Sequence, residues 1–289
     1  LANEASRLET PRSIYPLSTI SEIKEWCYHE GKTFWEYVSD CEGPEIWDYL
    51  DTVWETMCAT IQRGLNNDGV LPGGLKVARK ASTYWVKSKS YTDSLSSRAK
   101  IYAYALATSE ENASGGTVVT APTCGSSGVM PAVLYHLSTS RNFLRIRILR
   151  ALATAGLFGN VAKTNSSISG AEVGCQGEVG VACAMAAAAA CQLFGGTPSQ
   201  IEYAAEMGLE HHLGLTCDPV CGLVQVPCIE RNAIAAARAF DANAYATLSD
   251  GSHMVSFDKV VEVMNETGHA LPSLYRETSE GGLAKRFKR

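Results

Sequence analysis

The chain has 289 residues, of which 46% are hydrophobic and 19% are charged, and its formal net charge is −5. This length can bury a substantial core, and the composition is typical of a globular protein. The negative charge gives no reason to expect a nucleic-acid partner, which calls for a basic face. Ten cysteines are too sparse for a disulfide-stapled secreted module, so the sequence favours a reducing, cytoplasmic location.

Residues 1–20 are predicted to form an extended lead-in, because they contain Pro11 and Pro16 and show no amphipathic pattern. The lead-in lacks the apolar stretch of a signal peptide. Its first residue is Leu1 rather than Met, which suggests that a longer chain precedes it. The most apolar run, 179–194, falls short of the roughly 20 residues that cross a bilayer, so we expect a buried helix and no membrane partner.

Residues 21–289 are predicted to form one helical domain. Ser21 stands where a helix cap is expected, with Glu22 as the acid of the first turn. Further helices are expected at 33–38 and 45–64. In the second of these, apolar side chains recur every three or four residues and make one face: Ile46, Leu50, Val53, Trp54, Met57 and Ile61. After a glycine-rich loop, the basic stretch 76–87 is interpreted as a charged face or a subunit contact, with steering of a substrate carboxylate as the less favoured alternative.

A long helix is expected at 93–111, and Asn112 begins the turn that ends it. The following run, 117–128, passes from β-branched residues through a proline to small hydroxyl residues and glycines before the next helix. Backbone N–H groups exposed at such a helix end suit an anion, for example the carboxylate of an amino acid. Close packing is the competing explanation for a glycine-rich turn of this kind.

The second half of the sequence continues the helical pattern. Helices are expected at 130–137, 145–158, 179–194, 198–208, 229–240, 243–248 and 257–267, with a tail from Pro272. Thr197 and Pro198 form a helix start, since proline is favoured in the first turn. No βαβ rhythm and little alternating β pattern occur. The sequence therefore predicts an all-α fold.

Several cysteines lie near glycine or proline residues that break regular structure, among them Cys175, Cys217 and Cys228. A backbone turned at such points can direct thiolates into a shared cavity, where they could bind a metal or an iron–sulfur cluster. Cys183 and Cys191 instead lie inside an unbroken alanine-rich run and are expected to be small buried residues. The compact Cys-x-x-Cys patterns of zinc and ferredoxin sites are absent, so spacing alone does not identify the metal.

Four segments resemble those of the iron–sulfur-dependent L-serine dehydratases, in that family's order and at its separations: 112–134, 168–188, 210–235 and 275–284. Weaker similarity extends back to the region near Tyr15. The resemblance implies an all-helical catalytic domain and a [4Fe–4S] cluster held by Cys175, Cys217 and Cys228. It also implies a smaller β domain or partner subunit with a Ser-His-Thr type motif, which does not occur in this sequence, and a homo- or hetero-oligomer.

The implied activity is the conversion of L-serine to pyruvate and ammonia. Expelling hydroxide from serine is difficult, and an iron with an open coordination position would polarise the leaving oxygen. We expect L-serine to be bound by residues of the glycine-rich turn and its surroundings: Asn112, Thr123, Gly125, Ser126, Ser127 and Ser169. His211 and Glu172 are the candidate catalytic residues. Two alternatives stay open, an L-cysteine desulfidase with the same kind of cluster and a non-catalytic metal-binding subunit.

Overall fold

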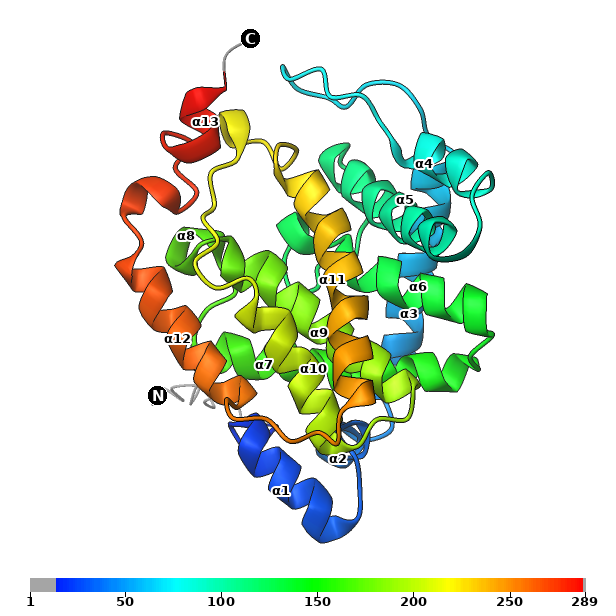
Figure 1. Ribbon diagram of the computed structural model, residues 1–289, viewed down its shortest axis with the longest axis vertical. Helices are drawn as coiled ribbons and strands as arrows, with labels where there is room; N and C mark the ends of the chain where they lie inside the picture. Colours follow the sequence, from blue (N-terminus) through cyan, green and yellow to red (C-terminus); the bar gives the residue numbers. More distant parts are fainter. Residues whose placement is uncertain (1–13, 288–289) are drawn as a thin grey trace, which may run out of the picture.

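The computed structural model of the protein describes residues 14–287 (Figure 1). Within that range the chain forms helices and loops with two isolated β-bridges and no strand, which confirms the predicted all-α fold. The helices of the first half are α1 (Ile20–Glu30), α2 (Phe34–Glu42), α3 (Ile46–Leu65), α4 (Ala81–Ser88), α5 (Asp93–Ala113), α6 (Val129–Arg141) and α7 (Arg145–Asn165). Those of the second half are α8 (Gly170–Val173), α9 (Val181–Leu193), α10 (Pro198–Glu210), α11 (Cys228–Leu248), α12 (Phe257–Ala270) and α13 (Gly282–Arg286).

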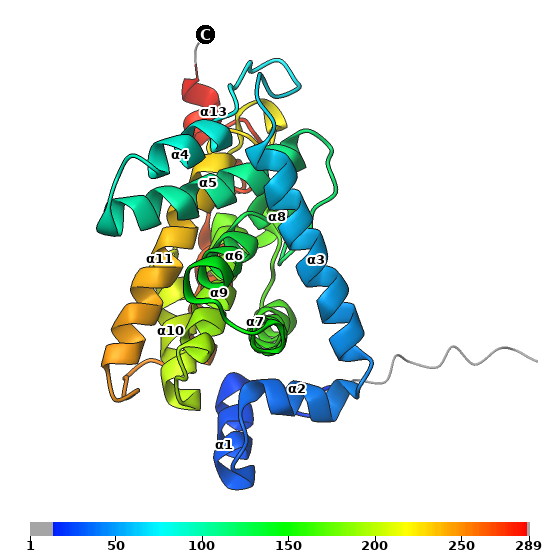
Figure 2. The same cartoon turned by 90° about the vertical axis from the view of Figure 1, so that its right-hand side faces the viewer.

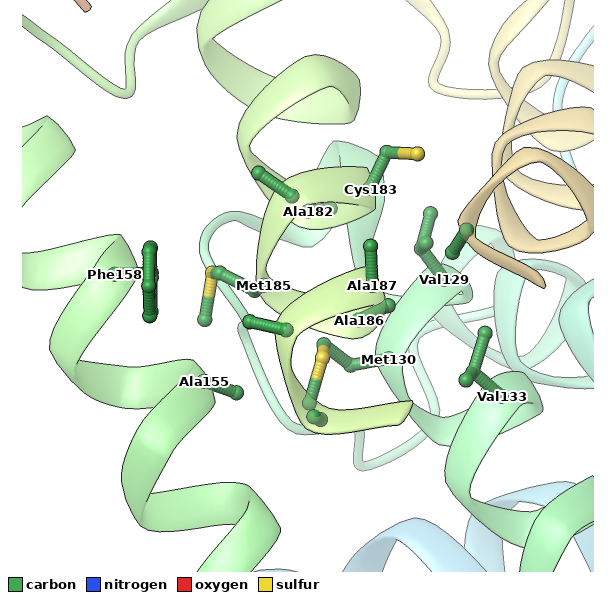
Figure 3. Packing of buried hydrophobic residues seen from close by; sticks show 14 of the residues in the cluster. Val129, Met130, Val133, Ala155, Phe158, Ala182, Cys183, Met185, Ala186 and Ala187 are labelled. Carbon is green, nitrogen blue, oxygen red and sulfur yellow. The ribbon is translucent and has the colours of Figure 1, made fainter. Parts of the chain in front are cut away.

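Helix α9 is the centre of the fold. Alanine, the best helix former, makes up most of it, and its residues from Val181 to Cys191 are buried. Figure 3 shows Phe158 and Ala155 of α7 on one side of α9, and Val129 and Val133 of α6 on the other. Helices α10 and α11 cover further faces of α9. The run predicted as an interior helix is therefore the element around which the other helices pack, and Cys183 and Cys191 are buried in it as expected.

Small residues allow α9 and α10 to lie close together. A Cβ atom on Gly208 would lie 2.9 Å from the Cα of Ala184, which is closer than real Cβ contacts come. Because a dense core gains dispersion energy from every close contact, this backbone-to-backbone approach stabilises the pair without large side chains. The thin alanine surface of α9 thus determines the packing distance.

Helix boundaries follow the capping residues. Helix α1 begins at Ile20, with Thr19 and Glu22 forming a capping box, so the cap lies two residues before the predicted Ser21. Thr33 caps α2 with Glu36, and Thr197 caps α10 as predicted. The helices expected at 229–240 and 243–248 are one helix, α11, because no glycine or proline separates them. Helix α4 lies in the stretch described from sequence only as basic.

One end of the molecule is built from short, irregular segments (Figures 1 and 2). Here α7 is followed by the single turn α8, by Gly174 with a φ of 77°, and by the π-helical turn η2 (Gln176–Gly180). The loop after α10 contains the 3-10 turn η3 (Val220–Gly222), and α13 packs against it. These breaks bring segments that are distant in sequence to one place.

No helix within residues 14–287 combines the length and the apolarity that a membrane crossing requires. Most of the predicted lead-in, residues 1–13, lies outside the described residues, and so do residues 288 and 289.

Candidate metal and substrate site

The irregular end brings two thiols and one carboxylate together. The Sγ atoms of Cys175 and Cys217 and a carboxylate oxygen of Glu178 all lie within 4.8 Å of one another. The Sγ of Cys217 lies 3.7 Å from Oε2 of Glu178. Both cysteines are buried, and Glu178 is mostly buried. Residues 42 positions apart in the sequence therefore present potential metal ligands to a common point.

Backbone breaks position each of these groups. Cys175 follows Gly174, whose positive φ turns the chain from α8 into η2, and Glu178 lies three residues later on the same turn. The C-terminal segment holds Cys217 by two backbone hydrogen bonds: the N–H of Cys217 donates to the carbonyl of Tyr275 (2.9 Å), and the N–H of Glu277 donates to the carbonyl of Cys217 (2.6 Å). The tail predicted from Pro272 thus forms one wall of the site.

The glycine-rich turn before α6 contacts the same carboxylate. The hydroxyl of Thr123 donates to Oε1 of Glu178 (2.8 Å) and lies 3.1 Å from the hydroxyl of Ser126. Ser126 and Ser127 are buried, and the hydroxyl of Ser127 donates to the carbonyl of Cys124 (2.9 Å). The substrate-binding turn inferred from sequence is therefore adjacent to the cysteine pair, and Glu178 connects the two.

Asn232 connects the glycine-rich turn before α6 to Cys228, the third candidate cysteine, by hydrogen bonds. Its side-chain Oδ1 accepts the N–H of Gly128 (2.9 Å), and its Nδ2 donates to the carbonyls of Gly125 and Cys228 (2.8 Å each). Cys228 is the first residue of α11 and lies near enough to Cys175 and Glu178 for their charges to act on its thiol. One buried amide thus fixes the turn relative to the start of α11.

The contact between the two cysteines shifts their pKa values in opposite directions. The Cys217 thiol donates to Cys175 and, helped by nearby Arg231, lowers the pKa of Cys175 below its usual value in spite of burial. The same hydrogen bond, together with burial, raises the pKa of Cys217. Burial raises the pKa of Cys228 to about 12 and also raises the pKa of Glu178. A bound cation would oppose these increases, because it favours the deprotonated form of each ligand.

Two glycines leave space around the carboxylate. A Cβ atom on Gly170 would lie 2.7 Å from Oε2 of Glu178 and 3.0 Å from Sγ of Cys217, and one on Gly125 would lie 3.0 Å from Oε1 of Glu178. Thiolates are soft ligands that select iron–sulfur clusters, zinc or copper(I). The absence of a side chain at Gly170 and Gly125 lets the Glu178 carboxylate and the Cys217 thiol lie against the backbone, and this donor set fits a metal group bound through cysteine sulfur.

Four of the residues predicted from sequence lie outside this contact network. Ser169 precedes α8, and its N–H donates to the hydroxyl of Ser167 (3.0 Å). Glu172 is exposed and accepts a hydrogen bond from Ser167. Asn112 is half-buried near the end of α5. His211 is exposed at the end of α10, where its Nδ1 contacts the carbonyl of Met207 (2.9 Å). Their functional roles stay predictions.

Sequence reasoning missed Glu178 and Asn232, although each carried a signal. Glu178 lies three residues after Cys175, and Asn232 lies four residues after Cys228, so each is one helical turn beyond a candidate ligand. Side chains at that spacing share a face. A search for polar residues one turn from each cysteine would have found both.

The chain is similar to known proteins along most of its length. The family model "Serine dehydratase alpha chain" matches residues 9–284. The L-serine dehydratase of Streptomyces coelicolor is 52% identical over 83% of this chain and 53% of its own length. L-serine dehydratase 1 of Escherichia coli is 48% identical over 93% of this chain and 62% of its own length, and the Helicobacter pylori L-serine dehydratase is 40% identical over 95% and 62%. The chain therefore spans less than two thirds of the length of these relatives.

Proposed function

The chain belongs to the serine dehydratase alpha chain family, and from that premise we propose that it forms the catalytic part of an L-serine dehydratase. The reaction converts L-serine to pyruvate and ammonia. The observation that carries the proposal is the approach of the Cys175 and Cys217 thiols to Glu178, beside the hydroxyl-rich turn. The names of the relatives support L-serine as the substrate.

We propose a [4Fe–4S] cluster as the cofactor, held by Cys175, Cys217 and Cys228. Cysteine thiolates are the usual ligands of such clusters, and the lowered pKa of Cys175 favours the ligating form. When bound, the cluster would supply a Lewis acid that polarises the β-hydroxyl oxygen of serine. Asn232 supports this ligand set, because it connects the carbonyl of Cys228 to the turn beside Glu178.

The residues of the turn bind the amino acid in this proposal. The turn formed by Thr123, Gly125, Ser126 and Ser127 holds its carboxylate, and the hydroxyls of Thr123 and Ser127 then exchange the hydrogen bonds that they donate to Glu178 and to the carbonyl of Cys124. The Glu178 carboxylate accepts a hydrogen bond from the ammonium group of the substrate. Fixing the substrate at both ends aligns the Cα–H and Cβ–O bonds that break, which lowers the entropic part of the barrier. Loss of the Cα proton and of the hydroxyl, together one water, leaves aminoacrylate, which tautomerises and hydrolyses to pyruvate and ammonia.

The additional length of the relatives supports a further proposal about partners. We expect a smaller β domain or subunit to complete the active site, within a homo- or hetero-oligomer and in the cytoplasm. His211 and Glu172 stay predicted catalytic residues. Substitution of each, with pyruvate formation as the readout, would test whether either one takes the Cα proton.

Anaerobic reconstitution tests the cofactor independently of activity. The purified chain, mixed with iron and sulfide under argon, should turn brown and take up about four irons per chain, as a [4Fe–4S] cluster requires. The Cys217→Ala variant should lose most of this uptake. Cys191→Ala is the matched control, because Cys191 is equally buried but lies near the C-terminal end of α9, at the opposite end from η2. A chain that takes up no iron, or equal uptake by the Cys217→Ala variant, would contradict the proposal.

Activity then separates the serine dehydratase from its alternatives. Reconstituted chain, alone and with a β domain supplied by a relative, should form pyruvate from L-serine faster than from L-cysteine. Faster release of sulfide from L-cysteine would identify a desulfidase instead. A brown protein that turns over neither amino acid, even with the added domain, would identify a non-catalytic metal-binding subunit.

A further inference from the structure

A second polar cavity lies at the other end of α9. It has a volume of about 240 Å³ and is lined by side chains from α2 and α7 and by the turn that follows α9. We name it the arginine pocket and define it by Trp35, Arg147, Arg150, Leu193 and Gly195. Helix α9 spans about 20 Å at 1.5 Å per residue, so the pocket lies well away from Cys175 and Glu178, which precede the helix.

Arg150 is held in place but lacks acceptors. Its guanidinium carbon lies 4.0 Å from the centre of the Trp35 ring, a stacked arrangement that fixes the plane of the group. Its Nε is buried and has no hydrogen-bond partner among the described residues. A buried donor without an acceptor costs free energy, so this atom indicates an acceptor that the protein itself does not supply.

Arg147 provides a second guanidinium at the same cavity. Its Nη2 donates to the carbonyl of Leu193 (2.6 Å) at the end of α9, and its guanidinium lies 4.7 Å from the centre of the Phe143 ring. These contacts leave other N–H groups of the fork available. Each of the two arginines is therefore held by an aromatic ring, which reduces the entropy that a ligand would have to offset.

Neither arginine is neutralised by the protein. Within residues 14–287, no carboxylate lies within ion-pair distance of Arg147 or Arg150, whereas their neighbour Arg145 pairs with Asp51 and Glu55. Arg147 is exposed and Arg150 is half-buried, and both line the same cavity. The pair therefore calls for an anion from outside the chain.

We propose that the arginine pocket binds a phosphate group. Guanidinium forks match phosphate oxygens in bidentate geometry, and a phosphate or phosphate monoester carries close to two negative charges at neutral pH. One such group neutralises both arginines and gives the Nε of Arg150 an acceptor. The site is independent of the proposed serine chemistry, since it uses different residues at the opposite end of α9.

Thermal unfolding of the purified chain with added inorganic phosphate tests the proposal, because a ligand that binds only the folded state raises Tm. We expect millimolar phosphate to raise Tm by a few degrees relative to sodium chloride at matched ionic strength. In the Arg150→Gln variant, calorimetric titration should give at least a tenfold weaker affinity. Arg147→Gln is the second variant and should weaken binding similarly, which keeps the test decisive if loss of the Trp35 stacking impairs folding.

Arg145→Gln is the matched control. It removes the same charge from the same helix, but this guanidinium is occupied by two carboxylates and does not line the pocket, so the response to phosphate should persist. Succinate should give no comparable shift. Glycerol phosphate distinguishes the two possible sources of the phosphate group. If it binds more tightly than inorganic phosphate, the ligand is an organic phosphate ester, and if it binds more weakly, the ligand is the free phosphate ion. A shift no larger than that of chloride, an equal shift with succinate, or unchanged affinity in both pocket variants overturns the proposal.

Discussion

The centre of the fold and the candidate site differ in how regular their backbone is. Helix α9 is regular, nearly all alanine, and buried along almost its whole length. The site next to it is built from a four-residue helix, a π-helical turn and loops, with positive φ angles at Gly174 and Cys221. A regular helix repeats its side-chain directions every 3.6 residues, and short broken segments can aim side chains from distant positions at one point.

The two regions therefore have different roles: the core around α9 stabilises the fold, and the irregular end holds the polar groups of the candidate site. The alanine core supplies stability through close backbone approach. The irregular end loses part of that stability, because it removes polar groups such as Asn232 and most of Glu178 from water. Changes in the core should therefore alter the free energy of unfolding without altering metal binding. Changes at the irregular end should alter metal binding and leave the free energy of unfolding nearly unchanged.

The largest expected effect is that of Phe158→Ala. The ring is fully buried and makes edge contacts with Phe34 (5.2 Å between centroids) and Phe257 (5.1 Å), so it joins α7 to α2 and α12. Truncating such a residue leaves a cavity and costs about 3–5 kcal/mol. Urea unfolding should show a lower midpoint with an unchanged slope. The exposed Leu248 gives the control, because Leu248→Ala should change stability by less than about 0.5 kcal/mol.

A pH-dependent effect of similar size is expected at Glu206 on α10. Burial, with Glu210 and Glu202 nearby, raises the pKa of this carboxyl group from 4.5 to about 7. The folded-state pKa is higher than the unfolded one, so this stability is complete below pH 4.5 and is lost as the pH rises through 7. The shift corresponds to about 3 kcal/mol.

Glu206→Gln should therefore stabilise the chain by about 2–3 kcal/mol at pH 8 and change it little at pH 4.5. Urea midpoints measured across this range give the comparison. Glu210→Gln on the same helix should show a much smaller pH dependence, because Glu210 is more exposed. A Glu206→Gln chain with the same pH profile as the parent would mean that Glu206 is ionised in the fold at neutral pH.

Much of the fold could be predicted from the sequence, because its helices carry local signals. The structure confirms the predicted apolar face of α3 and the predicted start of α10 at Thr197 and Pro198. Helix α4 was missed, since only Ala81 and Ser88 of its residues are buried and the helix therefore shows no apolar period. The break predicted between residues 240 and 243 was wrong, because the residues there continue α11 and an acid such as Asp241 inside a helix costs only a few tenths of a kcal/mol.

The candidate site was harder to derive, because convergence in space leaves no local pattern. Glycine and proline near Cys175, Cys217 and Cys228 indicated where the chain turns, but not which residues meet. The contact of Cys217 with the segment 275–277 depends on backbone hydrogen bonds between distant residues. Only the family resemblance gave the cysteines as a set, and it did not include Glu178 or Asn232, which the geometry adds.

A smaller effect on stability is expected for Gly208→Ala in the core. The new Cβ would lie 2.9 Å from Cα and 3.0 Å from N of Ala184, and both atoms belong to the backbone of α9, which cannot move without its neighbours. Overpacking costs about 1–3 kcal/mol, and replacing a helical glycine returns up to about 1 kcal/mol. The net loss should be about 1–2 kcal/mol by urea unfolding. Iron uptake per folded chain should match the parent chain, because Gly208 lies in α10, outside the cysteine site.

The same substitution at the irregular end, Gly170→Ala, should have the smallest effect on stability and a large effect on the metal. Its Cβ would meet the ends of two side chains, Oε2 of Glu178 and Sγ of Cys217, which can move aside at a cost below about 1 kcal/mol. Displacing them disturbs the donor set, so iron uptake after anaerobic reconstitution should fall several-fold while the urea midpoint changes little.

Gly208→Ala is the matched control for this variant, because the same methyl group is added in the core. The two variants should have opposite effects. Gly208→Ala should lower the free energy of unfolding and retain iron uptake, and Gly170→Ala should retain the free energy of unfolding and lose iron uptake. Equal iron uptake by Gly170→Ala and the parent chain would show that the space beside Glu178 and Cys217 is not used by a cluster. The core and the irregular end would then differ in how they pack, but the proposal that the irregular end binds the metal would lose its support.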